Sequence, residues 1–395
     1  MLKYDFDRVI DRRNTRSYKW DQSEKLFGDK DIMPLWVADM DFESPPAVKE
    51  ALLRRAEEGI YGYSVSSDSY KEAIIAWFNR RHQWEIQPEW ITDSPGIVTS
   101  LSLSVELFSK PGDQVIIQSP VYYPFYDVIH MNDRKVAKNP LIERNGRFEM
   151  DFEQLEGLMQ GGAKLLLLCS PHNPGGRVWE REELLQLGAL CLQYEVTVIS
   201  DEIHCDLALA GHKHIPFASL SAEIANITLT TLAATKTFNL PGLQTSYIVA
   251  SNPNLKRKFD KRLKALSLHM SGFLAPEAVQ AAYNEGEEWL DELQQYIAGN
   301  VDYAISYLSE HLPQVHVMRP QATYLLWLDC RELKLDIAGL KKLMYSEAKV
   351  AFNEGSVFGT EGVGHLRINM ACPRSILVEA LERFSQAAKA YVVKS

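Results

Sequence analysis

The sequence predicts an α/β protein with a mostly parallel central sheet, because short apolar runs alternate along the chain with segments of helical periodicity. The runs are rich in Val, Ile, Leu and Thr, and several of them are apolar on both faces. Strands of this kind occur in parallel sheets that helices cover on both sides. We expect strands at residues 114–119, 164–170, 196–200, 227–232 and 245–250.

Helical segments precede and separate these strands. Residues 45–59 begin with two prolines and end at Gly59, which are typical start and stop signals, and residues 70–82 have a helical apolar spacing. Between the second and third strands, residues 181–195 have the apolar spacing of a crossover helix. A strand, a crossover helix and another strand in this order place the two strands parallel.

The pattern changes after about residue 290, where a long helical segment is followed by an isolated strand-like run at 322–330. Further helical stretches and a short strand at 364–370 complete the chain. We expect a second, smaller α+β domain, which the N-terminal residues complete. The predicted division is a large domain at residues 45–290 and a small domain formed by residues 1–44 and 291–395.

Composition and charge exclude several classes of function. The chain has 395 residues, of which 46% are hydrophobic and 24% charged, as in an ordinary globular protein. Its 42 basic and 52 acidic residues give a net charge of -10, which disfavours non-specific binding to nucleic acid or to an anionic membrane. No run approaches the ~20 apolar residues of a membrane span, and the first residues lack the apolar core of a secretory signal, so we expect a cytoplasmic protein. The five cysteines are odd in number and form no CxxC pair, so we predict neither disulfides nor a metal site.

A ligand site is expected beyond the carboxyl ends of the parallel strands, on the side that faces the small domain. Residues 164–170 lead into a turn with Asn173 at its centre, and residues 196–200 are followed by Asp201. Each has a structural alternative, since Asn is a common turn residue and Asp can cap a turn or pair with an arginine. A buried carboxylate nevertheless needs a partner, which makes Asp201 a candidate for a ligand contact.

Two more strands are followed by residues suited to chemistry. Lys236 follows the strand at 227–232 and precedes an apolar turn, an environment that lowers the pKa of an ammonium group and frees a nucleophilic amine. The alternative is a solvated lysine, which is by far the commoner case. Tyr122 or Tyr123, which follow the strand at 114–119, would lie over the same crevice.

A helical stretch that begins near SPGIVTSL adds a candidate anion site. A helix N-terminus presents free backbone N–H groups and the positive end of the helix dipole, so it can bind a phosphate. The donors here would be the N–H groups of Gly96, Ile97, Val98 and Thr99. This signal is weak by itself.

Taken in order, the motifs resemble those of the fold-type I pyridoxal-phosphate (PLP) enzymes of the class I and II aminotransferase group. The matching segments are SPHNPGG, DEIH, ATKTFNLPGL and GHLRINMACPRS. A closer set, which resembles the MalY/PatB branch of cystathionine β-lyases or cysteine-S-conjugate β-lyases, consists of WVADMDF, GIYGYS, CSPHNPGGRVW, VISDEIHCDL, KTFNLPGLQ and RINMACPRS. The resemblance covers nearly the whole chain, and it implies the fold-type I architecture with PLP as the cofactor of the large domain.

Two departures from the general aminotransferase pattern resemble the lyase branch. Gln244 stands where the pattern has an arginine eight residues after the lysine, and His204 stands where it has a tyrosine three residues after the aspartate. The resemblance therefore implies that other groups hold the cofactor phosphate. These groups are the amides of Ile97 and Val98, the hydroxyl of Thr235, and Tyr63 from the second subunit of a homodimer.

The resemblance also implies roles for the residues that face the cofactor. Lys236 binds PLP covalently, hands it to the substrate amine and then removes the proton from the substrate Cα. Asp201 pairs with the ring nitrogen and so stabilises the negative charge that develops in the transition state. Asn173 donates a hydrogen bond to the phenolic oxygen of the ring.

Three further side chains complete the expected site. Tyr122 stacks on the ring, and His204 lies nearby, although a packed core histidine is an equally good interpretation. Arg367 binds the substrate α-carboxylate through its planar guanidinium, a geometry that lysine does not reproduce. The implied substrate-binding residues are Arg367 and Tyr63. Arg374, seven residues later, is interpreted as structural.

The implied reaction is the α,β-elimination of cystathionine or a related cysteine S-conjugate, a small amino-acid thioether. Its products would be a thiol such as homocysteine, pyruvate and ammonia. Candidates for the acid that protonates the leaving sulfur are Tyr61, Tyr63 and Tyr324, each with simple packing as the alternative. Two other functions stay open: an aminotransferase that uses a keto-acid acceptor, and a binding or regulatory protein that retains the fold.

Overall fold

The computed structural model describes residues 3–392. The strands of its large sheet are β2 (Ile91–Ser94), β3 (Gln114–Ile117), β4 (Lys135–Lys138), β7 (Leu165–Cys169), β8 (Thr197–Asp201), β9 (Thr228–Leu232) and β10 (Ser246–Val249). They lie in the order β2-β10-β9-β8-β7-β3-β4, and every neighbouring pair is parallel except the two that involve β10. The predicted α/β class and mostly parallel sheet are confirmed.

The direction of β10 departs from the rest of the sheet. All five predicted runs overlap strands, but β10 is antiparallel to both β2 and β9. The connection from β9 to β10 contains only the four-residue helix α10 (Ala234–Thr237) and a short 3-10 turn. It therefore lacks the long crossover helix that a parallel return usually needs.

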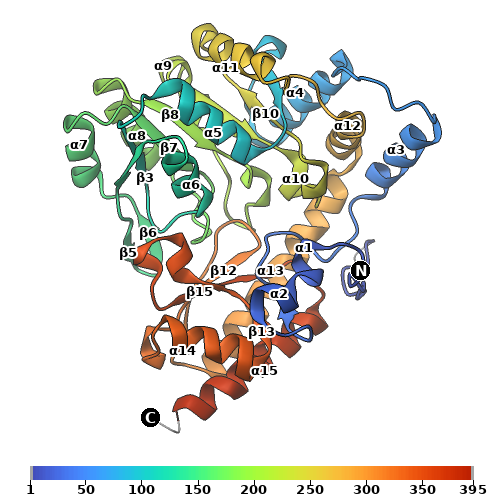
Figure 1. Cartoon of the computed structure of the whole chain (residues 1–395), viewed down its shortest axis with the longest axis vertical. Helices are drawn as coiled ribbons and strands as arrows, with labels where there is room; N and C mark the ends of the chain where they lie inside the picture. The colour runs from blue at the N-terminus through green and yellow to red at the C-terminus, as the bar shows by residue number, and fades with distance from the viewer. Residues whose placement is uncertain (1–2, 393–395) are drawn as a thin grey trace.

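Helices cover the sheet on both faces. Successive strand residues point to opposite sides, so strands that are apolar throughout place apolar side chains on each face for a layer of helices to cover. These helices are α5 (Ile97–Phe108), α6 (Pro124–His130), α7 (Phe152–Gln160), α8 (Arg181–Gln193) and α11 (Pro253–Ala265). In β7, Leu166 and Leu168 share a core cluster with α7 and α8, whereas Leu165 and Leu167 share another with α5, α6 and α11. Figure 1 shows this layered part in the upper half of the molecule.

A second group of helices packs beside the sheet. It consists of α3 (Pro46–Glu57), α4 (Asp68–His82), α12 (Ala275–Glu285) and the long α13 (Glu287–His311). Both α3 and α4 match predicted helices, and both contact α12. The loop between α3 and α4 extends along the outer edge of the molecule in Figure 1.

The lower part of the molecule combines the two ends of the chain. It contains an antiparallel sheet in the order β11-β12-β15-β14, with strands at His316–Met318, Leu325–Asp329, His365–Asn369 and Asn353–Glu354, respectively. The N-terminal segment carries α1 (Tyr18–Asp21), α2 (Ser23–Phe27) and β1 (Met33–Pro34), and β1 pairs with β13 (Val350–Ala351). Further elements of the chain are the hairpin β5 (Ile142–Arg144) and β6 (Arg147–Glu149), and the helices α9 (Ala222–Asn226), α14 (Ile337–Lys342) and α15 (Arg374–Val392).

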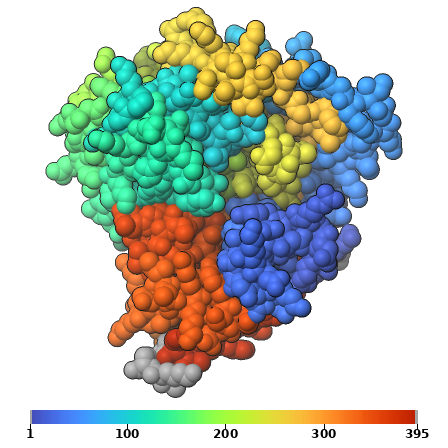
Figure 2. Space-filling model, in the orientation of Figure 1, coloured from blue at the N-terminus to red at the C-terminus, as the bar shows by residue number. Residues whose placement is uncertain are grey.

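Figure 2 shows the N-terminal residues beside the C-terminal part, below the helices of the large sheet. Helix α13 crosses the predicted boundary at residue 290, and the division into two domains stays a prediction. Among residues 3–392, no helix combines the length and the apolar character that a membrane crossing requires. All five cysteines fall in this range and are buried and free.

Candidate active site

A cavity of about 250 Å³ lies where four adjacent parallel strands end. These strands are β9, β8, β7 and β3, and the residues that follow them are brought to one edge of the sheet. Each contributes to the lining of the cavity: Lys236 follows β9, Asp201 ends β8, Asn173 follows β7 and Tyr122 follows β3. Strand β15 of the lower part adds Arg367.

Most of the predicted site residues meet in this cavity. Its lining includes Ile97, Val98, Tyr122, Asn173, Asp201, His204, Thr235, Lys236 and Arg367. Tyr63 does not belong to it, because it lies on the loop between α3 and α4 with 97% of its surface exposed. A contribution of Tyr63 to the site of a second subunit stays a prediction.

Lys236 sits in α10 with its amine directed at a backbone oxygen. Its Nζ donates a hydrogen bond to the carbonyl of Ala38. Desolvation lowers the pKa of Lys236 to about 8; the charge of Asp39 opposes this shift, and that of Arg367 adds to it. A lysine with such a pKa has a substantial neutral fraction near neutral pH, which a nucleophile or general base requires.

Asp201 is the last residue of β8 and is 3% exposed. Burial raises its pKa to about 7, although the backbone N–H of Ile203, at 3.2 Å from Oδ1, acts in the opposite direction. In the part of the chain that the structure describes, this is the one hydrogen bond to its carboxylate. A cationic partner in the cavity would stabilise the ionised form.

Arg367 is buried and held in a fixed orientation. Its Nη1 donates to Asn173 Oδ1 at 2.9 Å, and its Nη2 donates to Asn353 Oδ1 at 2.6 Å and to the Trp36 carbonyl at 3.0 Å. The guanidinium also lies over the ring of Phe358, 4.7 Å from its centroid. Its Nε is buried and has no hydrogen-bond partner among residues 3–392. Burial lowers the pKa of Arg367 to about 10, so it stays cationic at neutral pH and can bind a carboxylate.

The N-terminus of α5 forms another wall of the cavity. The amides of Ile97 and Val98 lie in the first helical turn, where backbone N–H groups have no acceptor within the helix. Gly96 caps the helix with a φ of 146°, a conformation that side chains with a Cβ rarely adopt. Thr235 and Gln244 line the same cavity, so an anion here would meet neutral donors in place of an arginine.

Two predicted ring neighbours, His204 and Tyr122, also line the cavity. Burial, together with the charges of Lys236 and Arg367, lowers the pKa of His204 to about 3, so its ring is neutral. Its Nδ1 is buried without a hydrogen-bond partner in the described part of the chain. Burial raises the pKa of Tyr122 above its ordinary value, so its phenol keeps its proton.

The three tyrosines that are candidates for the acid that protonates the leaving sulfur lie in different surroundings. Tyr324 is fully buried beside the cavity, and its hydroxyl donates to the Ala38 carbonyl at 3.0 Å. Tyr61 is 63% exposed and donates to the Ala56 carbonyl at 3.1 Å, and Tyr63 is exposed as described above. Arg374 lies at the start of α15, where its Nε donates to Asn300 Oδ1 at 2.6 Å.

Several lining residues are absent from the sequence prediction. The backbone of Trp36, Val37 and Ala38 forms one side of the cavity, and Asn353 holds Arg367. The motif WVADMDF marks the first group, but Trp36, Val37 and Ala38 themselves are not residue types that reveal a catalytic role. Asn353 gives no signal, because it faces Arg367 only through the register of β14 against β15.

The residues of the cavity fit a bound pyridoxal phosphate. An amine of lowered pKa suits its aldehyde, and a buried carboxylate of raised pKa suits a ring nitrogen. The free amides of α5 suit its phosphate. Arg367 lines the cavity, and its Nη1 has two N–H groups but donates one hydrogen bond among the described residues, to Asn173, which leaves donor capacity for the carboxylate of an amino acid.

Comparisons with known proteins agree with this geometry. The family described as "Aminotransferase class I and II" matches residues 30–384. Cystathionine beta-lyase PatB of Bacillus subtilis is 46% identical over 383 residues, which cover 97% of this chain and 99% of PatB. Cystalysin from Treponema denticola, whose structure contains PLP, has a TM-score of 0.96 at 38% identity, with coverage of 98% of this chain and 100% of its own.

A second solved structure gives the same result. The PLP-bound C-S lyase from Staphylococcus hominis has a TM-score of 0.92 at 32% identity, and 98% of each chain is covered. These values confirm the fold-type I architecture and the resemblance that the motifs indicate. The chain therefore belongs to the class I and II aminotransferase family, in the group that includes PatB, cystalysin and the Staphylococcus hominis C-S lyase.

Proposed function

We propose that the chain is a PLP-dependent carbon–sulfur lyase that eliminates a thiol from cystathionine or a related cysteine S-conjugate. The observation that carries the proposal is the single cavity in which Lys236, Asp201 and Arg367 meet in a protein of the PatB group. When bound, PLP supplies an aldehyde that combines with amines and an electron-poor ring that takes up negative charge.

The cofactor would be held at three points. Asp201 would keep a proton on the ring nitrogen, and the amides of α5 together with Thr235 would bind the phosphate. Asn173 turns its carbonyl oxygen to Arg367, so its amide NH2 is left to donate to the phenolic oxygen of the ring. Tyr122 and His204 would pack beside the ring.

The substrate would be oriented by Arg367, which binds the α-carboxylate while Asn173 and Asn353 fix the guanidinium. Lys236 would then take the Cα proton onto Nζ, where the Ala38 carbonyl accepts a hydrogen bond from the ammonium formed. The electron pair of the broken C–H bond forms a Cα–Cβ double bond as the Cβ–S bond breaks. The sulfur leaves as a thiolate and takes up a proton, and water converts the remaining fragment into pyruvate and ammonia.

A product assay tests this proposal. The purified holoenzyme is given cystathionine without any keto acid, and pyruvate and free thiol are measured, with Lys236→Ala as the control. We expect both products in equal amounts from the wild type and neither from the variant. Sustained absence of both from the wild type would contradict the lyase, and strict dependence on an added keto acid would identify an aminotransferase instead.

We propose further that the protein is a homodimer, in which Tyr63 reaches the phosphate and substrate of the partner's site. The support is the loop between α3 and α4, where Ile60, Tyr63 and Val65 are 76%, 97% and 82% exposed. Apolar surface of this kind is typical of interaction sites. The buried free cysteines fit a reducing compartment, and we propose the cytoplasm as its location.

A further inference from the structure

Residues 36–42, which we call the strap, present backbone carbonyls to the side chains that would carry the chemistry. The Ala38 carbonyl accepts a hydrogen bond from Lys236 Nζ. The Trp36 carbonyl accepts one from Arg367 Nη2 at 3.0 Å. The strap therefore contacts both Lys236, the proposed base, and Arg367, the residue proposed to bind the substrate carboxylate.

Polar side chains from both parts of the molecule hold the same strap. Asn369 Nδ2 of β15 donates to the Val37 carbonyl at 2.6 Å and also to that of Asp39. Asn239, which follows α10, exchanges two hydrogen bonds with the backbone of Met40, at 3.0 and 3.1 Å. The strap thus spans the junction between the large sheet and the lower part.

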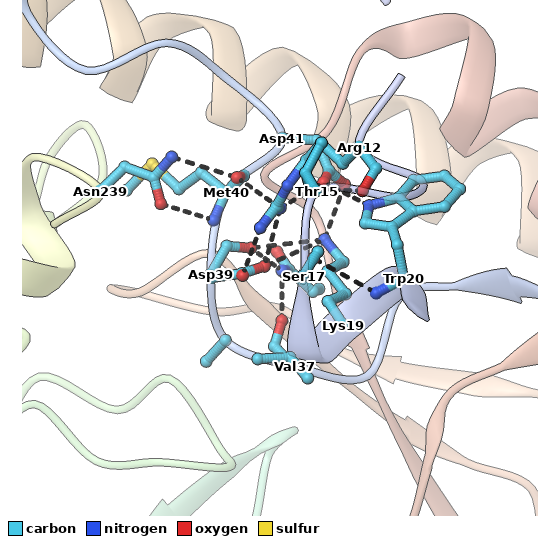
Figure 3. A network of polar contacts seen from close by, with 12 residues as sticks. Arg12, Thr15, Ser17, Lys19, Trp20, Val37, Asp39, Met40, Asp41 and Asn239 are labelled. Atoms are coloured by element: carbon cyan, nitrogen blue, oxygen red, sulfur yellow. Dashed lines mark hydrogen bonds and ion pairs between the residues drawn. The ribbon is translucent and has the colours of Figure 1, made fainter. Parts of the chain in front are cut away.

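The carboxylates of the strap are directed away from these contacts, toward the N-terminal segment (Figure 3). Arg12 bridges both of them, since its Nη2 lies 2.8 Å from Asp39 Oδ2 and its Nη1 lies 2.7 Å from Asp41 Oδ1. Lys19 Nζ lies 2.6 Å from Asp41 Oδ2. We call Arg12, Lys19, Asp39 and Asp41 the ion-pair cluster.

The ion-pair cluster is balanced and largely out of water. The side chains of Lys19 and Asp41 are each 1% exposed, and those of Asp39 and Arg12 are 14% and 24% exposed. Two cations therefore face two carboxylates, and each buried charge has an opposite charge within hydrogen-bond distance. Because an unpaired buried charge is strongly unfavourable, this cluster allows the strap few alternative positions.

We propose that the ion-pair cluster is a positioning device for the reaction. It fixes the strap so that the Ala38 carbonyl meets Lys236 and the Trp36 carbonyl meets Arg367. None of its members lines the cavity, and apart from the charge that Asp39 exerts on Lys236 they act through the strap. The inference rests on the function proposed above, but the order of the strap can be measured without any reaction.

The two contacts differ in what they would control. Arg367 is held by Asn173 and Asn353 as well as by Trp36, so a displaced strap removes one of three supports. Lys236 Nζ, by contrast, has one hydrogen-bond acceptor among the described residues, which is the Ala38 carbonyl. A loosened cluster should therefore lower kcat more than it raises KM.

Arg12→Gln is the test variant, because Arg12 is the most exposed member of the cluster and lies closer to the Asp39 carboxylate, at 2.8 Å, than Lys19 does, at 3.5 Å. Arg12→Lys is the conservative variant, which keeps the charge and loses the planar fork. Leu187→Ala in α8 is the stability control, since Leu187 is fully buried in the core cluster on the far side of β7 from α5. The holoenzymes are compared by amide hydrogen exchange of residues 36–42, by release of bound coenzyme after dilution, and by kcat per bound coenzyme.

In Arg12→Gln we expect strap exchange to rise about tenfold and coenzyme release to accelerate. We also expect kcat to fall about tenfold, with KM changed by less than about threefold. Arg12→Lys should lie between the wild type and Arg12→Gln, and Leu187→Ala should lower the melting temperature while all these values stay near those of the wild type.

Two results would overturn the inference. One is strap exchange in Arg12→Gln within about twofold of the wild type. The other is faster exchange while both coenzyme release and kcat stay unchanged, or are changed equally by Leu187→Ala. If the wild type eliminates no thiol, the proposed function fails, whereas exchange and coenzyme release still decide whether the cluster positions the strap.

Discussion

Two buried acids lie five residues apart at the end of β8 and just beyond it, one in the cavity and one bonded to side chains of α4 and α10, and their surroundings differ. Asp201 and Asp206 are each 3% exposed. The carboxylate of Asp206 accepts three side-chain hydrogen bonds, from His82 at 2.7 Å, Trp77 at 2.9 Å and Thr237 at 2.9 Å. Asp201 accepts one, from the backbone of Ile203 at 3.2 Å.

The pKa values of the two acids move in opposite directions. Burial would raise the pKa of Asp206, but the hydrogen bonds from His82, Thr237 and Trp77 lower it below its ordinary value. Burial raises the pKa of Asp201 to about 7, because its own chain provides too few donors. The protein itself satisfies the acid that joins α4 to α10, and it leaves the acid of the cavity to be satisfied by a ligand.

Asp201→Asn gives the largest expected effect on activity. The amide keeps the shape of the side chain but cannot pair with a cationic ring nitrogen, so kcat should fall by about a hundredfold to a thousandfold. The unfolding free energy of the coenzyme-free protein should not fall, because the substitution removes a poorly solvated carboxylate. Steady-state kinetics per bound coenzyme and urea unfolding measure the two values. A large loss of stability with unchanged kcat would reverse the roles assigned to the two acids.

Asp206→Ala should give the opposite result. Three buried donors lose their acceptor, so we expect the unfolding free energy to fall by about 3 kcal/mol. The kcat per bound coenzyme should fall by less than about tenfold, since Asp206 reaches Lys236 only through the neighbouring Thr237. Thr237→Val is the matched control, because it removes one of the three hydrogen bonds and should cost about 1 kcal/mol. Urea unfolding separates these values, and equal losses in both variants would contradict the network.

The same two acids show how far sequence reasoning extends. Parallel strands bring their carboxyl ends to one edge, so Asn173, Asp201 and Lys236 were predictable as neighbours. The segment DEIHCD, however, contains Asp206 as well as Asp201, and residue type alone does not show how the surroundings of the two acids differ. What separates them is a set of donors on α4, more than a hundred residues earlier in the chain, and only the tertiary fold brings those donors to Asp206.

Other features depend on the fold in the same way. The antiparallel direction of β10 follows from a connection without a long helix, and its apolar sequence resembles that of its parallel neighbours. The strap is a recognisable motif, but its part in the site comes from main-chain carbonyls, which every residue type possesses. Residue types reveal side-chain chemistry at strand ends, whereas backbone contacts and strand register require coordinates.

The dependence of stability on pH gives the sharpest comparison of the two acids. The pKa of Asp201 is about 7 in the folded chain and about 4 in an unfolded one, so between these values the folded state holds the extra proton. Its contribution to the unfolding free energy is fully present below pH ~4 and is lost as the pH rises through ~7. A shift of about three pKa units corresponds to a loss of about 4 kcal/mol over this range in the coenzyme-free wild type relative to Asp201→Asn.

Asp206 should contribute with the opposite sign. Its folded-state pKa is lowered, so the stability that it provides is present above the ordinary pKa of an aspartate and is lost as the pH falls below that value. Urea unfolding of the wild type and the two variants at a series of pH values yields two difference curves. Their slopes should have opposite signs, because one carboxylate lacks a partner in the free protein and the other already has three. Curves of the same sign would show that Asp201 is satisfied without a ligand, and the case for a cofactor contact at this position would fail.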